Sequence, residues 1–287
     1  MPNPLRDSFL ADHAGIAARH AAVLRPDHAT RALVVGGIAL AIVIYVGALV
    51  LLGFSPSRMW AGLYRLGDIA MLMLPPVTTS WARAEIYLHA LGQTLAIAFL
   101  GTATAAVLAV PFGFLAARNV VANRVLHAVA RRTLDAARSI DTLIWALIWI
   151  NVVGLGPFAG ALAIMSSDLP TFAKLMSEAI ETADRRPVEG VTAAGGSRLH
   201  AIRFGIVPQV LPVIASQVLY YFESNTRSAT IIGIVGAGGI GLVLSEQIRT
   251  LEWQEAAFII LLVLVTVAII DAISQRLRAA IIGRRSE

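Results

Sequence analysis

Long apolar runs constrain the fold of this chain more than any other feature. A helix needs about 20 mostly apolar residues to cross the hydrocarbon core of a bilayer, and runs of this kind recur from residue 33 onward. Charged residues make up 14% of the chain, whereas they make up about 25% of an average soluble domain. The sequence therefore predicts an all-α membrane protein with about six transmembrane helices. The predicted spans cover residues 33–54, 90–117, 139–155, 158–176, 206–221 and 256–273.

The residue types that are missing exclude several kinds of chemistry. The chain has no cysteine, so disulfides, thiolate metal sites and cysteine nucleophiles are excluded. Its single lysine, Lys174, follows no glycine-rich loop, and a phosphate-binding loop needs a lysine directly after its glycines. ATP hydrolysis by that route would need a partner chain. The histidines show no metal-ligand spacing, so we expect no metal and no cofactor; they are His13, His20, His28, His89, His127 and His200.

The positive charges predict the topology. The net charge of +5 comes from arginines that flank the apolar segments, which fits the excess of Lys and Arg in cytoplasmic loops better than a nucleic-acid partner. With both termini in the cytoplasm, 18 of the 23 Lys and Arg residues fall on the cytoplasmic side and 4 outside, with Arg227 unassigned. We thus expect a multi-pass protein of the bacterial cytoplasmic (inner) membrane, surrounded by lipid, whose N- and C-termini are cytoplasmic.

The spans divide the chain into four parts. The N-terminus has mixed charge and lacks the apolar core of a signal peptide, so we expect it to be retained. Trp60 and Tyr64 follow the first span and favour a helix at the outer membrane interface. We expect a cytoplasmic N-terminal segment at residues 1–32, followed by a first span with an outer interfacial segment at 33–84. A transmembrane core at 85–276 and a cytoplasmic tail at 277–287 complete the chain.

A long polar loop separates the fourth and fifth spans. Residues 187–212 read PVEGVTAAGGSRLHAIRFGIVPQVLP, which predicts a helix, a turn at Gly195 and Gly196, a second helix, and prolines that open the next span. A loop of this length in a compact bundle is usually functional. Two short amphipathic helices at the cytoplasmic surface suit the docking of another protein. An ordinary surface loop is the alternative interpretation.

This loop resembles the EAA loop of ABC importer permeases, in which Glu-Ala-Ala is followed after three residues by glycine and later by a closing proline. The matching residues are Glu189, Gly195 and Pro208, while Gly205 stands where isoleucine is usual. The resemblance implies that residues 177–208 form coupling helices that sit in a cleft of an ATPase subunit. The ATPase-coupling residues that it implies are Glu189, Gly195, Gly196, Arg198 and Pro208.

The wider resemblance is closest to the phosphonate-uptake permeases and covers roughly residues 85–276. It implies the type I ABC importer permease fold, a homodimer of permease copies, two ATPase subunits and an extracytoplasmic substrate-binding protein. It also implies alternating access, phosphonate or a related phosphorus oxyanion as cargo, and no covalent chemistry on this chain. Methionine, phosphate and phosphite are the alternative cargoes. The segments that carry the resemblance are 101–119, 138–163, 174–181 and 222–241.

The glycine run from Gly236 to Gly241 matches the GxGxxG pattern letter by letter. A dinucleotide site needs that pattern between a strand and a helix of a soluble βαβ unit. The run lies in an apolar region instead, so we expect close helix packing or a broken re-entrant helix.

Four polar residues in apolar segments are candidates for the translocation pathway. Glu223 and Arg227 are four apart and share a helix face. Arg227 either meets an anionic substrate, with Asn225 as a neutral donor, or forms a self-satisfied pair with Glu223. Asp168 lies mid-span and should face protein or water, because a lone carboxylate there costs about 2.5–3.5 kcal/mol. The predicted pathway residues are Glu223, Asn225, Arg227 and Asp168.

Two other classes of protein stay open. A membrane-embedded enzyme would need a catalytic constellation, and the sequence shows no cluster of His, Asp and Glu and no Ser–His pairing. A non-transporting membrane scaffold would leave the intramembrane charges unexplained.

Overall fold

The computed structural model describes residues 15, 28–120 and 123–283. Every regular element in this part of the chain is helical, which confirms the predicted all-α fold. The chain forms two compact units, residues 1–68 and 69–287, and each is described by itself. The predicted cytoplasmic segment lies almost entirely outside the described residues, so its role stays a prediction.

The first unit consists of a long apolar helix and most of a second helix, α4 His28–Leu51 and α5 Pro56–Leu72. From Arg31 onward, α4 is long and apolar enough to cross a membrane. Its apolar side chains are exposed, as expected of a helix surrounded by lipid. α5 begins with a proline, whose missing N–H is tolerated at the first helical position. A helix is therefore present in the predicted outer segment, and its place at the membrane interface stays a prediction.

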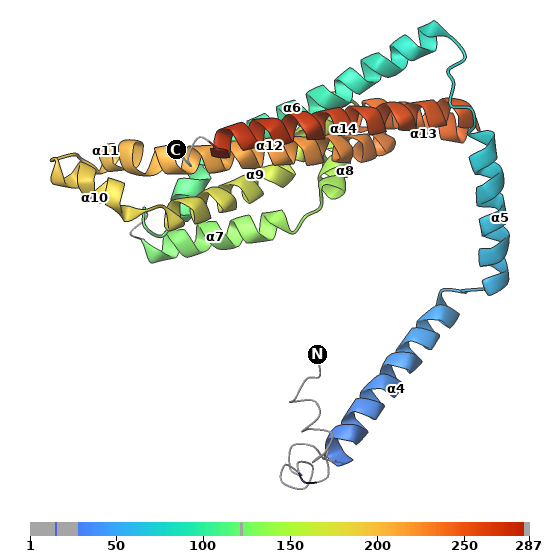
Figure 1. Cartoon of the computed structure of the whole chain (residues 1–287), viewed down its shortest axis with the longest axis horizontal. Helices are drawn as coiled ribbons and strands as arrows, with labels where there is room; N and C mark the ends of the chain where they lie inside the picture. Colours follow the sequence, from blue (N-terminus) through green and yellow to red (C-terminus); the bar gives the residue numbers. More distant parts are fainter. Residues whose placement is uncertain (1–14, 16–27, 121–122, 284–287) are drawn as a thin grey trace, which may run out of the picture. The chain divides into compact units, whose positions relative to one another are not determined.

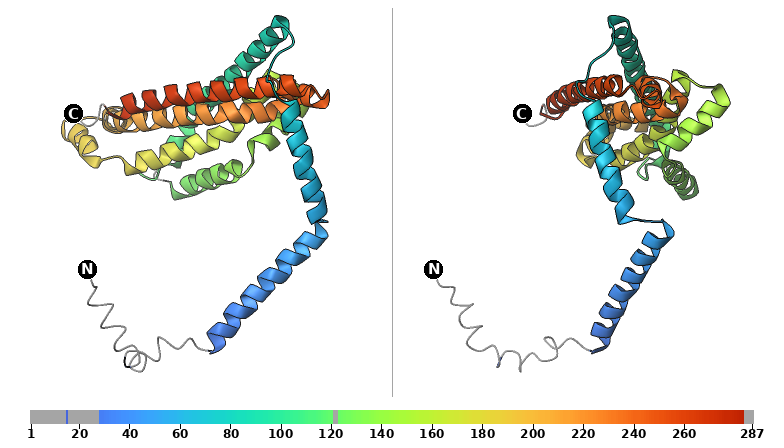
Figure 2. Two further views of the ribbon diagram at one scale, coloured as in Figure 1. Left: turned by 45° about the vertical axis from the view of Figure 1, so that its right-hand side comes forward. Right: turned by 90° about the vertical axis from the view of Figure 1, so that its right-hand side faces the viewer.

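The second unit is a bundle of helices that run along a common direction (Figures 1 and 2). Its long helices are α6 Trp81–Ala116, α9 Pro157–Thr182, α12 Val207–Ile232 and α14 Trp253–Gly283. Its shorter elements are α7 Arg124–Arg138, α8 Thr142–Val153, α10 Arg185–Ala193, α11 Arg198–His200, α13 Ile240–Arg249 and the π-helical turns η1 Ala201–Ile206 and η2 Gly233–Ala237. Figure 1 shows α10 and α11 at one end of the bundle and α13 at the other.

Small residues let α6 and α9 pack closely. A Cβ added to Gly101 would lie 2.7 Å from the Cβ of Ile164, and one added to Gly113 would lie 2.9 Å from the Cβ of Met176. Lipid tails are as apolar as leucine, so helices in a membrane associate through close van der Waals contact of this kind. Gly101, Gly113 and the buried alanines of α6 therefore serve helix packing.

Six helical segments are compatible with the six predicted spans. Among the described residues, α4, α6, α12 with its preceding turns, and α14 are each long and apolar enough to cross a membrane. α7 and α8 form a fifth candidate that is bent by 88°. α9 is the sixth: its 26 residues extend about 39 Å, and Asp168 and Lys174 lower its hydropathy.

Asp141 explains the bend between α7 and α8. Its side chain accepts a hydrogen bond from the backbone N–H of Leu143 at 2.8 Å and so caps a new helix. α8 has 12 residues and is about 18 Å long, less than the roughly 30 Å of a hydrocarbon core. α8 alone therefore crosses only part of a bilayer.

α12 continues past the expected end of the fifth span. The prediction ended that span at residue 221, where the polar sequence Glu-Ser-Asn-Thr-Arg follows, but the helix runs to Ile232. The expected boundary was wrong because Glu223 and Asn225 find polar partners on other helices. Polar residues satisfied in this way do not end a transmembrane helix.

The glycine run breaks the chain between α12 and α13. Gly236, Gly238 and Gly239 have φ angles of 105°, 80° and 75°, which residues with a Cβ rarely adopt. The N–H of Ile240 donates to the Thr94 hydroxyl of α6 at 2.8 Å, so the break is held against the bundle. The predicted helix break is confirmed, and its helical surroundings exclude a dinucleotide site.

Candidate functional site

The predicted coupling loop folds as two short helices joined by a glycine turn. Asp184 caps α10 by accepting a hydrogen bond from the Arg186 N–H at 3.1 Å. Gly195 has a φ of 84°, and a Cβ added to Gly196 would lie 2.7 Å from the carbonyl oxygen of Val191. The turn therefore needs both glycines. The predicted arrangement of helix, Gly-Gly turn and helix is confirmed.

α10 is anchored directly on the start of α12. A Cβ added to Gly205 would lie 2.9 Å from a methyl carbon of Val188, so the glycine at this position lets η1 touch α10. Gln209 accepts a hydrogen bond from the Asp184 N–H at 2.9 Å and donates to the carbonyl oxygen of Gly205 at 2.7 Å. A displacement of α10 is therefore transmitted to α12.

The loop exposes apolar and charged side chains together. Leu199 is 77% exposed, and Phe204 is also exposed, beside exposed Glu189 and Arg198. Exposed apolar side chains with a polar rim mark interaction surfaces. The sequence interpretation missed Leu199 and Phe204, although two large apolar residues inside a polar loop were a usable signal.

The remaining predicted coupling residues also have contacts within the chain. Arg198 donates from Nη2 to the carbonyl oxygen of Val120, which joins α11 to the segment that follows α6. Pro208 lies in the first turn of α12, directly after the π-helical turn η1. Contact of these residues with an ATPase stays a prediction.

Glu223 pairs with two arginines. Its Oε1 lies 3.5 Å from Nη1 of Arg227, and its Oε2 lies 3.2 Å from Nη2 of Arg278 on α14. The Arg278 guanidinium also lies 5.7 Å from the ring centroid of Tyr220, within cation–π range. The sequence assigned Arg278 to a cytoplasmic flank, and nothing in its spacing pointed to Glu223. The predicted pair Glu223–Arg227 is therefore part of a three-charge cluster.

Asp168 lies inside the bundle and not at its surface. Asn225 donates from Nδ2 to Oδ2 of Asp168 at 2.5 Å and to the hydroxyl of Thr102 at 2.8 Å. All three side chains are buried, so helices α6, α9 and α12 meet at this polar contact. Asp168 faces protein, as predicted. The structure brings Asp168 and Asn225 together. Asn225 lies on α12 two residues after Glu223 of the charged cluster.

One face of α12 is uncovered within the second unit. Tyr220, Arg227, Ile231 and Ile234 recur at intervals typical of a single helix face, and all four are exposed. The Arg227 side chain is 52% exposed. A hollow of about 250 Å³ adjoins this face at η2 and α13, and Arg249 is among its lining residues. Arg227 is the one exposed charged residue of α12, and Ser224 lies beside it on the same face.

A buried carboxylate, that of Glu255, joins the first turn of α14 to α6 and to the segment before α6. Glu255 of α14 accepts hydrogen bonds from the N–H and hydroxyl of Thr79 at 2.7 and 2.5 Å and from the Tyr87 hydroxyl at 2.8 Å. Arg83 adds an ion pair at 3.2 Å. The sequence interpretation did not single out Glu255, because its partners lie about 170 residues away along the chain.

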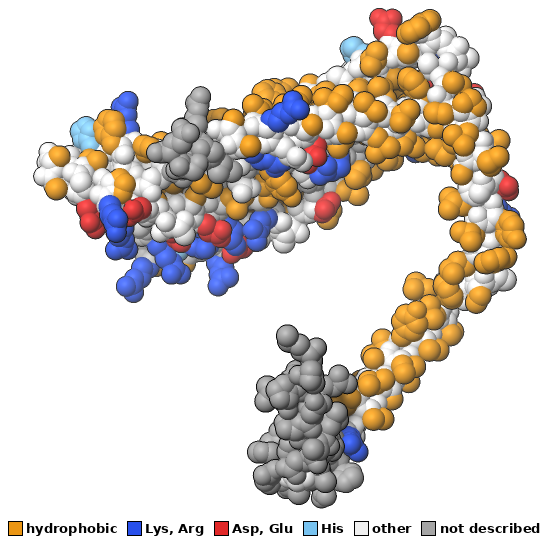
Figure 3. Space-filling view, viewed as in Figure 1, with side chains coloured by type: hydrophobic (Ala, Val, Ile, Leu, Met, Phe, Trp, Pro, Cys, Tyr) orange, Lys and Arg blue, Asp and Glu red, His pale blue; other side chains and the backbone are white. Residues whose placement is uncertain are grey.

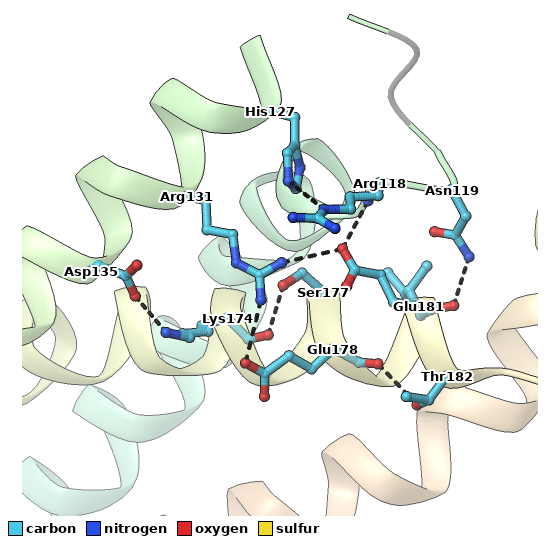
Figure 4. A network of polar contacts seen from close by, with 11 residues as sticks. Arg118, Asn119, His127, Arg131, Asp135, Lys174, Ser177, Glu178, Glu181 and Thr182 are labelled. Carbon is cyan, nitrogen blue, oxygen red and sulfur yellow. Dashed lines mark hydrogen bonds and ion pairs between the residues drawn. The ribbon is translucent and has the colours of Figure 1, made fainter. Parts of the chain in front are cut away.

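A second polar network joins α7 to α9 near the coupling loop, and Figure 4 shows Arg131 reaching between Glu178 and Glu181. The two distances are 3.7 and 3.4 Å. Lys174 lies 2.5 Å from Asp135. The only lysine of the chain therefore has a structural partner. In the described parts of the chain no three His, Asp or Glu side chains gather as metal ligands.

Known transport proteins match this chain along most of its length. Residues 109–286 match the family described as "Binding-protein-dependent transport system inner membrane component". The phosphite transport system permease protein PtxC of Stutzerimonas stutzeri is 36% identical over 248 residues, 85% of this chain and 86% of that protein. The phosphate-import permease protein PhnE of Mycolicibacterium smegmatis is 35% identical over 237 residues, 83% of this chain and 44% of that protein.

The fold also matches that of a solved transporter. A chain of the MetNI methionine ABC transporter, in inward facing conformations, superposes with a TM-score of 0.62 at 20% identity and covers 71% of this chain and 99% of that chain. The predicted ABC importer permease fold is thus confirmed. Members of the matching family work in the inner membrane with ATPase subunits and a substrate-binding protein. This chain therefore belongs to the family of binding-protein-dependent transport system inner membrane components, as the permease subunit of an ABC importer.

Proposed function

We propose that this permease carries phosphonate or a related phosphorus oxyanion, such as phosphite or phosphate. The roles of two relatives support this cargo, since one is a phosphite permease and the other a phosphate-import permease. The observation that carries the proposal is Arg227, a half-exposed guanidinium and the one exposed charged side chain of α12. A guanidinium presents a fork of N–H donors that fits two oxygens of an oxyanion.

The charge of the cluster also favours an anion. Glu223, Arg227 and Arg278 together carry a net charge of +1, so one positive charge is left for a substrate to balance. Arg227 is the more exposed of the two arginines, and water screens contacts at exposed charges. The contact is therefore weak enough to release the cargo. Asp168 and Asn225 act beside it by holding α12 against α9.

Two copies of this chain would enclose the pathway between the uncovered faces of their α12 helices. One bundle with one open face encloses no pore, and an apolar face with a single cation suits a lined channel better than contact with lipid. We assign two ATPase subunits to the coupling loops, residues 177–208, and an extracytoplasmic binding protein to the opposite end. Both chain termini and the coupling loops then lie in the cytoplasm, as the arginine distribution predicts.

The anchoring of α10 suggests how ATP drives transport by alternating access. ATP binding draws the two ATPases together and moves the coupling loops with them. Because Gln209 and Gly205 tie α10 to α12, the displacement reaches the helix that carries Arg227. The two α12 helices then part at the outer end, and hydrolysis returns them. The permease itself breaks no bond.

Uptake in a strain that lacks the chromosomal permease tests this function. Wild-type permease should restore uptake of labelled phosphonate, phosphite or phosphate. Arg227→Gln should lower that uptake about tenfold, the effect of one charge-assisted hydrogen bond, while the complex with the ATPase still assembles. Arg276→Gln removes an exposed arginine from α14 and should leave uptake unchanged. Uptake of methionine alone, or normal anion uptake by Arg227→Gln, would overturn the proposal.

A further inference from the structure

A basic groove lies beside α7, outside the coupling loop and away from the uncovered face of α12. Its volume is about 320 Å³. Figure 3 shows Lys and Arg side chains gathered along this end of the bundle. The lining residues are Arg118, His127, Ala128, Arg131, Arg132 and Asp135.

The acidic groups around the groove already have cationic partners. Asp135 pairs with Lys174 at 2.5 Å, and Glu181 accepts from Arg131 and from the backbone N–H of Arg118, at 3.4 and 2.9 Å. These contacts appear in Figure 4. Each of these carboxylates is therefore already engaged by at least one cation.

Two arginines of the groove keep their charge available. Within residues 28–120 and 123–283, the side chains of Arg118 and Arg132 form no ion pair with a carboxylate. Arg118 donates from Nε to Nε2 of His127 at 3.3 Å, which leaves its Nη atoms without a carboxylate. The groove lining thus holds three arginines and one carboxylate, that of Asp135.

The outward side of α7 is apolar. Val125 is 71% exposed, and Leu126 and Val129 are exposed as well. A helix that combines arginines with exposed apolar side chains is typical of the bilayer surface, and Arg132, three residues after Val129, borders this apolar side. The next helix, α8, exposes Ile144 and Leu147, so the exposed apolar surface continues from α7 into a helix that is long enough to cross part of a bilayer.

We propose that this groove binds the phosphate group of an anionic phospholipid, whose acyl chains lie along Val125, Leu126 and Val129. Guanidinium groups match phosphate oxygens in geometry and charge, and basic pockets beside transmembrane helices take up anionic headgroups. Free phosphate presents a similar oxyanion but leaves the apolar side of α7 uncovered. The lipid satisfies both halves of the site. Its bound headgroup would hold α7 and α6 together next to the coupling loop.

Lipid retention by the purified permease–ATPase complex tests the proposal. The complex is placed in nanodiscs of phosphatidylglycerol and phosphatidylcholine, and the lipids it keeps after extraction are counted by native mass spectrometry. Wild-type complex should retain phosphatidylglycerol in preference. Arg118→Gln/Arg132→Gln should weaken that binding about thirtyfold, because each arginine near an anionic surface contributes about 1 kcal/mol and about 1.4 kcal/mol corresponds to tenfold.

Matched variants separate a built site from general surface charge. Arg124→Gln/Arg276→Gln removes two charges outside the groove lining and should retain the lipid. Arg118→Lys/Arg132→Lys keeps both charges but loses the guanidinium forks, so its binding should fall between that of the wild type and that of the Gln variant. Assembly with the ATPase serves as the folding control for every variant. Three results would overturn the proposal: equal loss in the Arg124/Arg276 variant, full retention in the Arg118/Arg132 variant, or displacement of the lipid by an excess of inorganic phosphate.

Discussion

Removing the charges of the α12 cluster one at a time separates its structural role from its role in transport. Arg227→Gln leaves Glu223 paired with Arg278, and Arg278→Gln leaves Glu223 paired with Arg227. Glu223→Gln leaves two arginines without a carboxylate. The three single variants therefore differ in the charge that they leave behind, although each removes one charge.

The structure gives the expected order of their stabilities. Charges 3.5 Å apart, as in Glu223–Arg227, attract by about 5 kcal/mol at an effective dielectric constant near 20. Because the Arg227 side chain is 52% exposed, water reduces its contribution to about 0–1 kcal/mol. Arg278 is 20% exposed and should contribute more. Glu223→Gln should cost about 3–5 kcal/mol, as for a buried pair that loses one partner.

Thermal unfolding of the purified complex and anion uptake measure the two roles separately. A loss of about 3 kcal/mol lowers the melting temperature of a domain of this size by roughly 10 °C, so Glu223→Gln should be clearly destabilised and Arg227→Gln nearly unchanged. Anion uptake should follow a different order, since Arg227→Gln should keep its stability but lose about tenfold in uptake. Glu223→Gln/Arg278→Gln should regain most of the lost stability, because it removes the uncompensated charge.

Two outcomes would refute this reasoning. If Arg227→Gln lowers the melting temperature as much as Glu223→Gln, the exposed pair holds the fold together and the screening argument fails. If Glu223→Gln/Arg227→Gln is more stable than Glu223→Gln/Arg278→Gln, then the charge of Arg278 does not depend on Glu223 for its balance.

Three further predictions concern other parts of the chain. Gly195→Trp should uncouple ATP hydrolysis from transport in proteoliposomes while the bundle stays folded, because a side chain at a φ of 84° distorts the coupling turn; full transport would contradict the assignment. With no native cysteine, an impermeant thiol reagent added to intact spheroplasts should label Ser57→Cys and not Ser286→Cys, and the opposite pattern would invert the topology. Glu255→Gln should lower the free energy of unfolding by about 1–3 kcal/mol, since a buried network loses its charged acceptor; an unchanged melting temperature would show that the network carries no stability.

Apolar length and the glycine pattern predicted the fold well. A run of about 20 apolar residues has few alternatives to a helix in lipid, so each predicted span falls on a helix, although α6 begins nine residues before its predicted range and α14 ends ten residues after it. The turn at Gly195 and the break at Gly236 were predicted because a positive φ selects glycine locally. The end of α12 was not predicted, because Glu223 and Asn225 are tolerated only through partners that lie on other helices.

In the candidate site too, contacts within one helix were predicted and contacts between helices were not. The spacing of Glu223 and Arg227 on one helix face predicted their pairing, since residues four apart are neighbours in any helix. Burial of Asp168 also followed from the cost of a carboxylate in lipid. That cost requires a partner but does not identify one, so Arg278, 55 residues beyond Glu223, was not predicted. Pairing across helices depends on packing, which the local sequence does not determine.

The two unpredicted partners lie on one helix, and this placement limits how the permease can move. Glu255 holds the first turn of α14 to α6 through Tyr87, and Arg278 holds its last turns to α12 through Glu223. Between these contacts α14 is mostly apolar. If α12 shifts during transport, the Glu223–Arg278 pair must either break or carry one end of α14 with it. Breaking the pair in an apolar setting is costly, so α14 should bend or tilt about its fixed end near Tyr87 while α12 moves.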